Sequence, residues 1–113
     1  MELEIRERSD DLTEVALVGK LDIQGLHAVD LEFHGATAAA KKDTLVDLSG
    51  LDFVASLGMG MLISCAQSLQ REGRTMVLVG ARGDVQTALE TAGIDQAIPM
   101  VADNDAALTV LAG

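Results

Sequence analysis

Residues 44–62, Thr44-Leu-Val-Asp-Leu-Ser-Gly-Leu-Asp-Phe-Val-Ala-Ser-Leu-Gly-Met-Gly-Met-Leu62, decide the fold that this sequence predicts. The short apolar run in residues 44–48 is typical of a strand that is buried on both faces. Ser49-Gly50 interrupts that run, and apolar residues recur at helical spacing from Leu62 to Leu69. The stretch therefore predicts a strand, a short loop and the start of a helix.

The first turn of this predicted helix is unusual. Ser56 stands just ahead of the helical pattern and is a typical N-cap residue. Residues 57–61 (LGMGM) hold two glycines and no Asp or Glu, and each glycine costs about 1 kcal/mol relative to alanine in a helix interior. The backbone N–H groups of the turn therefore lack an anion from within the turn, so a hydroxyl here is a suitable place for a phosphate group.

The two glycines leave two interpretations open. They could let the helix approach the sheet closely, which is a structural role. Alternatively, a bare turn lets the backbone of another protein come near Ser56, with adaptable apolar contacts from Leu57, Met59 and Met61. The two roles are compatible with each other.

Two strands and a helix are predicted before the central stretch. Residues 2–8 alternate apolar and charged side chains, and residues 13–18 form a second strand after the turn at residues 9–11, so the pair predicts a hairpin. Residues 19–22 end the second strand. The apolar stripe in residues 24–40 predicts an amphipathic helix with Lys41 and Lys42 in its last turn, where cations suit the helix dipole.

Beyond the central stretch, strands and helices continue to alternate. Gly73 ends the helix that follows Ser56, residues 75–79 form a continuous apolar strand, and a third helix runs from Asp84 to Gly93. Residues 98–101 form a short strand that Pro99 confines to a sheet edge. A last helix follows, capped by Asp103, with four residues predicted to face inward: Ala106, Ala107, Val110 and Leu111.

The order β-β-α-β-α-β-α-β-α predicts a single α/β domain over residues 1–113. We expect a mixed sheet of about five strands with helices mainly on one face. Strands 44–48 and 75–79 should be central, and the hairpin and the Pro99 strand should lie toward the edges.

Composition narrows the classes of partner. The net charge is −10 and the only aromatic residues are two Phe, which argues against nucleic acid or anionic lipid, because both require a basic surface. The acidity could also serve solubility alone. A single cysteine, Cys65, lies on the apolar face of the predicted helix and is expected to be a core residue. The lack of an apolar run near 18 residues predicts no membrane span, and we expect a cytoplasmic protein.

The sequence predicts no enzyme active site, metal site or cofactor. His27 and His34 are seven residues apart, whereas metal ligands on a helix prefer closer spacing. Gly58-Met-Gly60 lacks the lysine and the full glycine spacing of a phosphate loop. Asp47 and Asp52 flank the end of the central strand, where α/β sites often lie, but the other acids and the lysine of a receiver domain do not accompany them.

The central stretch resembles a known family. Residues 47–62 are similar to the signature of STAS domains, the sulfate transporter and anti-sigma factor antagonist family. Gly19-Lys-Leu-Asp22 resembles the family's Gly-Glu-Leu-Asp segment, and residues 82–94 resemble its third helix with its Gly-Ile ending. A free-standing domain of this size is most similar to an anti-sigma factor antagonist, and the resemblance covers essentially the whole chain.

The resemblance implies a partner-switching role. In the family, the serine that matches Ser56 is phosphorylated by a kinase that doubles as the anti-sigma factor, and the unphosphorylated antagonist binds that kinase and frees the sigma factor. An acid that matches Asp22 lies near the acceptor serine. Ser56 is thus the expected phosphoacceptor, a weak homodimer is left open, and the expected partner-binding residues are Asp22, Leu57, Gly58, Met59, Gly60 and Met61.

The motif departs from the family at one point. The usual Asp-Ser-Ser-Gly or Asp-Ser-Ala-Gly is replaced by Ala55-Ser56-Leu57-Gly58, so the acid before the acceptor is missing. The missing acid supports an alternative to the partner-switching role. In that alternative the protein is a STAS scaffold or transporter-complex subunit that acts by protein binding without phosphorylation.

Overall fold

The computed structural model describes residues 1–112, except the side chains of Glu7 and Arg8. Within that range strands and helices alternate through most of the chain. Their order is β1 (Glu2–Arg8), β2 (Leu12–Leu21), α1 (Ile23–Ala36), the 3-10 helix η1 (Ala38–Ala40), β3 (Asp43–Asp47), β4 (Leu51–Val54), α2 (Ser56–Arg71), β5 (Met76–Val79), α3 (Gly83–Thr91), α4 (Ile94–Ala97), β6 (Met100–Val101) and α5 (Asn104–Ala112). No helix in this range is both long and apolar enough to cross a bilayer.

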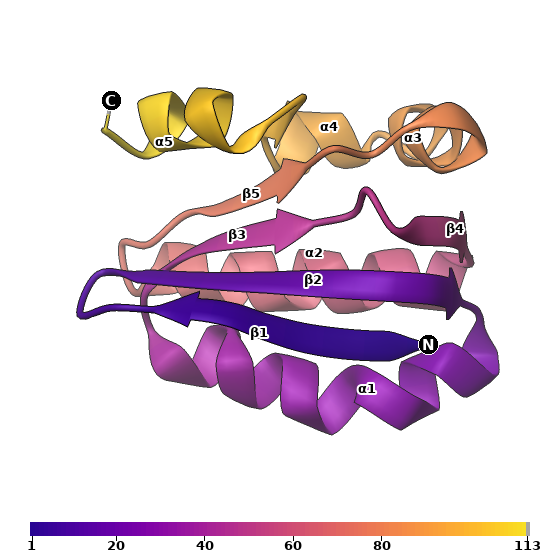
Figure 1. Cartoon of the computed structure of the whole chain (residues 1–113), viewed down its shortest axis with the longest axis horizontal. Coiled ribbons are helices and arrows are strands. Elements are labelled where there is room, and N and C mark those ends of the chain that lie inside the picture. Colours follow the sequence, from indigo (N-terminus) through magenta and orange to yellow (C-terminus); the bar gives the residue numbers. More distant parts are fainter. Residues whose placement is uncertain (113) are drawn as a thin grey trace.

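The sheet is mixed, with strand order β1-β2-β3-β5-β6 (Figure 1). β1 pairs with β2 antiparallel, and the remaining pairs are parallel. The two continuous apolar strands, β3 and β5, lie inside the sheet, and β6, which follows Pro99, lies at its edge. The mixed α/β fold, the central strands and the edge strand are therefore confirmed.

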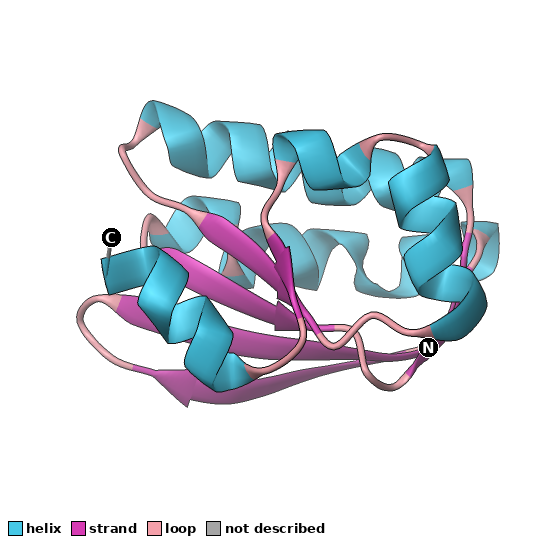
Figure 2. Ribbon diagram, turned by 90° about the horizontal axis from the view of Figure 1, so that it is seen from above, coloured by secondary structure: helices cyan, strands magenta, loops and turns pink. Residues whose placement is uncertain are grey.

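The two faces of the sheet are covered unequally. On one face, Val46 and Leu78 belong to a large core cluster with side chains of α1, α2, α3 and α4. On the other face, Leu45 and Val77 pack with Ala107 of α5 in a smaller cluster. In Figure 2 most helices lie on one side of the strands, and α5, near the C label, lies on the other. Helices mainly on one face are confirmed, and the alternating strand side chains separate the two clusters.

The N-terminal half departs from the predicted boundaries. β2 does not end at residue 18 but continues to Leu21, because β4 extends the parallel pairing along it. α1 ends at Ala36 rather than residue 40, where Thr37 turns the chain and its buried hydroxyl donates to the Phe33 carbonyl at 2.7 Å. Residues 41–42 therefore lie beyond η1 and not in the last turn of α1.

Two short elements were absent from the prediction. β4 pairs in parallel with the end of β2, Leu51 opposite Gly19 and Val54 opposite Leu21, and brings the number of strands to six. α4 is a four-residue helix after Gly93. Both are too short to show a period of their own, since a strand or helix is recognised by several repeats of its apolar pattern.

The glycines predicted to end two later helices and the aspartate predicted to cap the last helix have these roles in the structure. Gly73 and Gly93 adopt the left-handed conformation, with φ of 72° and 78°, and the carboxylate of Asp103 accepts from the Ala106 N–H at 2.8 Å. The predicted inward face of α5 is wrong at one residue. Val110 is 39% exposed, because α5 packs on β3 and β5 mainly through Ala107.

Candidate functional site

The loops that follow β2 and β4 meet at one end of the sheet. Leu21 and Val54 are partners in the parallel pair, and the Ala55 N–H donates to the Leu21 carbonyl at 2.9 Å. Asp22 and Ser56 each follow one of these bonded residues. Because parallel strands end at the same edge of a sheet, the two predicted site residues come together there.

The two glycines of the first turn have different surroundings. Gly58 is buried against β2: a Cβ on it would lie 2.6 Å from Leu21 Cγ and 3.2 Å from the Leu21 carbonyl oxygen. A Cβ on Gly60 would meet nothing within 4 Å. The close-approach interpretation therefore holds for Gly58, and packing does not require a glycine at position 60.

The sequence suggested that Ser56 is the N-cap of α2, and the structure shows that it is not. The N-cap is Ala55, in extended conformation with φ −89° and ψ 164°, and no side chain caps the helix. Ser56 is the first helical residue and is exposed. The helix therefore begins one residue earlier than expected, and the N–H of its N-cap, Ala55, donates to the Leu21 carbonyl. The first turn also holds no acid, so its positive dipole end has no anion from within the turn.

The apolar side chains of this turn divide between surface and core. Leu57 is 58% exposed and Met59 is half-buried, whereas Met61 is only 5% exposed and belongs to the main core cluster. The predicted contact role of Met61 is therefore corrected to a core role, and buried Gly58 acts by positioning the helix. Leu57, Met59 and Gly60 remain available for direct contact.

Asp22 caps a helix in addition to lying near Ser56. It is the N-cap of α1, and its carboxylate accepts from the Gly25 N–H at 2.8 Å. The carboxylate is half-buried. A cap and a partner contact are compatible, because an N-cap carboxylate uses one oxygen for the helix and keeps lone pairs on the other.

Two further apolar residues lie beside these loops, and sequence reasoning missed both. Ile23, directly after Asp22, is 55% exposed, and Phe53, two residues before Ala55, is 48% exposed. One sign of the exposure of Ile23 is that this residue lies outside the apolar stripe of α1. The exposure of Phe53 agrees with its pairing, because Phe53 lies opposite the exposed Lys20. We call the set of Asp22, Ile23, Phe53, Ser56 and Leu57 the α2-start surface.

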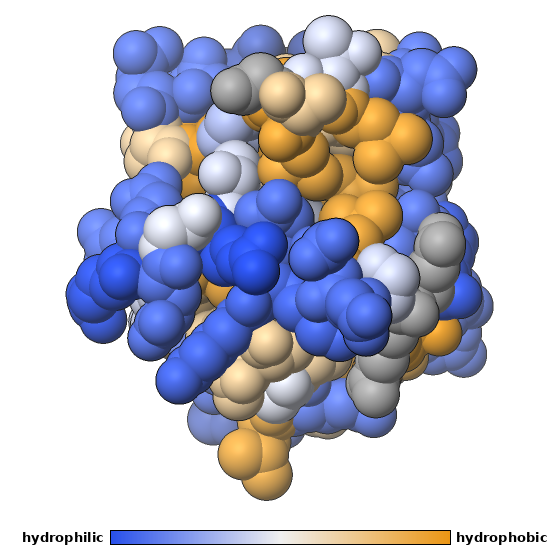
Figure 3. Space-filling model, turned by 90° about the vertical axis from the view of Figure 1, so that its left-hand side faces the viewer, coloured by the Kyte–Doolittle hydropathy of each residue, from blue (hydrophilic) through white to orange (hydrophobic). Residues whose placement is uncertain are grey.

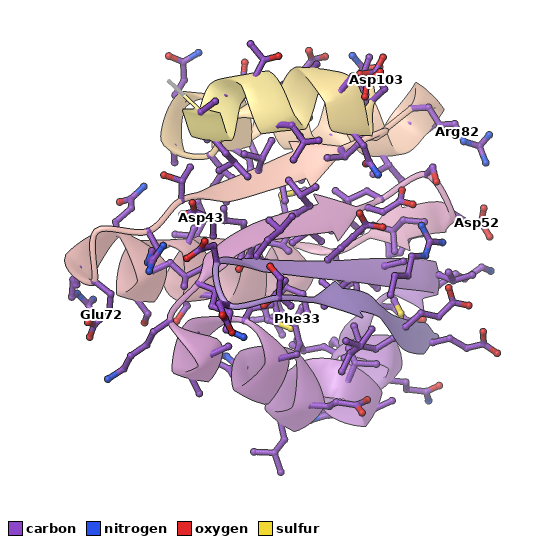
Figure 4. The ribbon with its side chains drawn as sticks, turned by 60° about the vertical axis from the view of Figure 1, so that its left-hand side comes forward. Phe33, Asp43, Asp52, Glu72, Arg82 and Asp103 are labelled. Carbon is purple, nitrogen blue, oxygen red and sulfur yellow. The ribbon has the colours of Figure 1, made fainter. Side chains whose placement is uncertain are left out.

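A shallow groove between β4 and the start of α3 adjoins this surface. It is lined by Leu51, Asp52, Arg82, Gly83, Asp84 and Val85. The Arg82 Nε–H donates to the Ser49 carbonyl at 3.0 Å, and Figure 4 shows Asp52 and Arg82 projecting outward from the same end of the molecule. Two acids, Asp52 and Asp84, therefore line this groove together with one cation, Arg82.

Asp47 is a structural residue and not a free acid. Burial acts to raise the pKa of its carboxyl, but hydrogen bonds from Ser49 and the Arg6 guanidinium outweigh burial and lower that pKa below its ordinary value. The Ser49 N–H donates to it at 2.8 Å, and Arg6 forms an ion pair with it across the sheet. A carboxylate held ionised in this way is poorly suited to donating a proton.

Cys65 contacts His34 but lacks the properties of a nucleophile. Its Sγ lies 3.3 Å from His34 Nδ1, and His34 Nε2 lies 3.2 Å from the Asp30 carboxylate. The thiol is fully buried, and this burial raises its pKa, whereas reactive cysteines are exposed and have a lowered pKa. Cys65 is confirmed as a core residue. Among residues 1–112 no group of three or more His, Cys, Asp and Glu residues is placed to hold a metal ion.

Comparison with known proteins gives one family match. A family model described as "Mlab, STAS domain" matches residues 5–102. No curated protein sequence matches the chain.

Several solved structures share the fold over nearly the whole chain. An anti-sigma factor antagonist from Mycobacterium paratuberculosis is 25% identical, with a TM-score of 0.83 over 99% of this chain and 96% of that one. The Bacillus cell fate determinant SpoIIAA in its phosphorylated form is 17% identical, with a TM-score of 0.65 over 96% of this chain and 97% of that one. The murine anion transporter Solute Carrier 26 family member A9 is 17% identical, with a TM-score of 0.74 over 95% of this chain but 19% of the transporter.

Proposed function

Because the chain belongs to the STAS domain family, we propose that it is a protein-binding regulator of the anti-sigma factor antagonist type. In its unmodified form it binds an anti-sigma factor that is also a serine kinase, through the α2-start surface. Phosphorylation at Ser56 weakens that binding. We place this partner-switching role in bacterial transcription control, in the cytoplasm, with no catalytic activity in the chain itself.

One observation carries this proposal. An exposed serine opens a helix whose first turn holds neither a capping side chain nor an acid, and exposed apolar side chains of Ile23, Phe53 and Leu57 lie on the segments around it. Exposed apolar groups beside a modifiable hydroxyl are what a switchable protein contact requires, because the same site supplies binding area and the point at which charge is added.

Phosphorylation should affect the fold and the partner in opposite ways. A phosphate adds roughly −1.5 to −2 charge and three acceptor oxygens at the N-terminus of α2, where the dipole favours an anion. The fold should therefore tolerate it. A partner that packs against Leu57 would have to desolvate the dianion, and Asp22 and Asp52 add charge of the same sign nearby.

A second candidate function is a STAS scaffold or transporter-complex subunit that binds a protein without being phosphorylated. Ala55 favours it, since the acid that usually precedes the acceptor serine is absent. The similarity to a domain of a murine anion transporter shows that the same fold also occurs as part of a transport protein.

Incubation with candidate serine kinases and ATP, followed by mass spectrometry, tests the proposal. We expect one phosphate, on Ser56, and none on Ser56→Ala. Ser64, exposed further along α2, supplies the matched control, so Ser64→Ala should still be modified. Ser56→Glu should fold normally and bind the same kinase more weakly, while Ser56→Ala should keep binding. A stable complex that no kinase modifies and that Ser56→Glu leaves unchanged would establish the scaffold function instead.

A further inference from the structure

The groove between β4 and α3 extends beyond the part described above. β4 pairs with β2, and α3 packs beside β4. Two hollows of about 260 and 240 Å³ open between β4 and α3, and they form one groove because they share three residues, Asp52, Asp84 and Val85. We call the second hollow the β4–α3 pocket, and its lining residues are Asp52, Phe53, Val54, Asp84, Val85 and Ala88.

The β4–α3 pocket has an apolar interior. Val54 and Val85 are buried and supply its floor, whereas Phe53 is 48% exposed and stands at its side. The chain has only two phenylalanines, and the other, Phe33, is fully buried. Phe53 is therefore the aromatic side chain that the molecule presents to a partner, and aromatic residues are enriched in protein interfaces.

The two acids of the pocket, Asp52 and Asp84, are exposed and form no ion pair among the side chains that the structure describes. Arg82 lines the first hollow but not the β4–α3 pocket, and its Nε–H donates to the Ser49 carbonyl at 3.0 Å. Hydrophilic side chains also form a broad band across the opposite end of the molecule (Figure 3). Acidity alone therefore does not distinguish the pocket, but two unpaired carboxylates beside an apolar interior do.

This combination fits an arginine side chain better than a lysine or an anionic ligand. A guanidinium is more weakly hydrated than an ammonium, it stacks on aromatic rings, and it binds carboxylates through several N–H groups. Its aliphatic stem can lie along buried apolar side chains while the charged group stays at the rim. Anions such as nucleotides would be repelled by the two carboxylates.

We propose that the β4–α3 pocket receives an arginine side chain of the protein that binds the α2-start surface, and that it helps to select that partner. Phe53 belongs to both the pocket and the α2-start surface, so a partner that packs against Phe53 also reaches the pocket. The identity of the partner rests on the proposed function. The preference of the pocket for arginine can be measured without any partner.

NMR titration of the whole chain with acetyl-arginine amide tests the pocket directly. We expect saturable chemical-shift changes centred on residues 52–54 and 84–88. Acetyl-citrulline amide has nearly the same shape without the positive charge and should cause much smaller changes, and the lysine analogue should bind more weakly than arginine. Equal binding of either control compound, or changes spread evenly over acids elsewhere in the chain, would overturn the proposal.

Asp84→Asn is the test variant, and Asp105→Asn is its matched control. Asp84 and Asp105 are exposed acids in the first turns of two nine-residue helices, α3 and α5. Both variants lose one charge and a similar interaction with a helix dipole, so their melting temperatures should change alike. Only Asp84→Asn should lose most of the shift changes caused by acetyl-arginine amide. Equal losses in the two variants would show that net charge, and not the pocket, attracts the arginine.

The same two variants separate this proposal from the proposed function. With the kinase that modifies Ser56, Asp84→Asn should raise the dissociation constant at least about tenfold, the loss expected for one charge-assisted hydrogen bond. Asp105→Asn should leave the dissociation constant unchanged. An unchanged dissociation constant in Asp84→Asn, with Ser56 still phosphorylated, would overturn the arginine pocket and leave the proposed function standing. If no kinase modifies Ser56, the proposed function fails, and the titration with acetyl-arginine amide alone decides whether the pocket exists.

Discussion

Gly58 lies against Leu21 so closely that a Cβ on the glycine would come within 2.6 Å of the leucine Cγ and 3.2 Å of its carbonyl oxygen. This contact joins the start of α2 to the end of β2. The hydrogen bond from the Ala55 N–H to the same carbonyl, at 2.9 Å, holds the preceding residue. Together they place Ser56, the first residue of α2, at the same end of the sheet as Asp22, so the geometry of the candidate switch depends on one backbone approach.

The contact predicts that replacing the two glycines of the turn by alanine has opposite effects on the stability of the protein. Gly58→Ala should destabilise the protein by about 1–3 kcal/mol, because the new methyl group must displace Leu21 or the helix. Gly60→Ala has open space and should stabilise the protein by up to about 1 kcal/mol through helix propensity. Urea denaturation measures both. Equal effects at the two positions would show that Gly58 does not control the approach of α2 to β2.

The position of the N-cap of α2 predicts that Ser56→Ala changes the free energy of unfolding little. A substitution at Ala55, the residue before it, should change that free energy more. Ser56 makes no capping hydrogen bond, so its removal should change the free energy of unfolding by less than about 0.5 kcal/mol. Ala55→Asp places an acceptor at the true N-cap, where the backbone is already extended, and should stabilise by about 0.5–2 kcal/mol. Thermal unfolding checks this pair, and a loss above 1 kcal/mol in Ser56→Ala would restore Ser56 as the cap.

Substitutions at Leu57 and Met61 should affect different properties: the first should weaken binding of the partner, and the second should lower the stability of the fold. Leu57 is 58% exposed and Met61 is 5% exposed. Leu57→Lys should leave the melting temperature nearly unchanged and lower the affinity for the kinase partner at least about tenfold. Met61→Ala should cost about 2–5 kcal/mol of stability through the cavity it leaves in the core. Calorimetric titration and thermal melts give the two readouts, and an unchanged affinity in Leu57→Lys would exclude this residue from the interface.

Asp47 should make stability depend on pH in the acid range. Burial opposes the lowering of its pKa, but Ser49 and Arg6 hold that pKa below the ordinary value of 3.8. The ionised carboxylate therefore contributes stability that is fully present above pH 3.8 and is lost as the pH falls through the lowered pKa. Asp47→Asn should cost about 1 kcal/mol at neutral pH, and its difference from wild type should shrink as the pH falls below that value.

The control for this prediction is Asp52→Asn on the same segment of chain. Asp52 is exposed, so its substitution should change stability little at either pH. Denaturation curves measured at neutral and acid pH compare the three proteins. A difference between Asp47→Asn and wild type that persists unchanged into acid would show that the ionised carboxylate is not what stabilises this part of the sheet.

Most of the sheet and its helices could be predicted from the sequence, because their signals are local and repeat several times. The apolar runs of β3 and β5, the stripe of α2 and the glycines after α2 and α3 each report their own conformation. The bare first turn of α2 was also readable, since it depends only on which residues are absent from five consecutive positions. Ser56 was found in this way, whereas Asp22 was named from its place after the second strand and from the family resemblance.

Only the tertiary structure decided what depends on contacts between distant segments. β4 exists because the extended end of β2 offers it a partner. Ala55 rather than Ser56 is the N-cap of α2, and its N–H is held by Leu21, which is far away in sequence. The exposure of Ile23 and Phe53 and the burial of Met61 were likewise set by how the elements pack. A local pattern indicates the conformation of a segment, but which hydrogen bond or apolar contact completes it depends on where the rest of the chain lies.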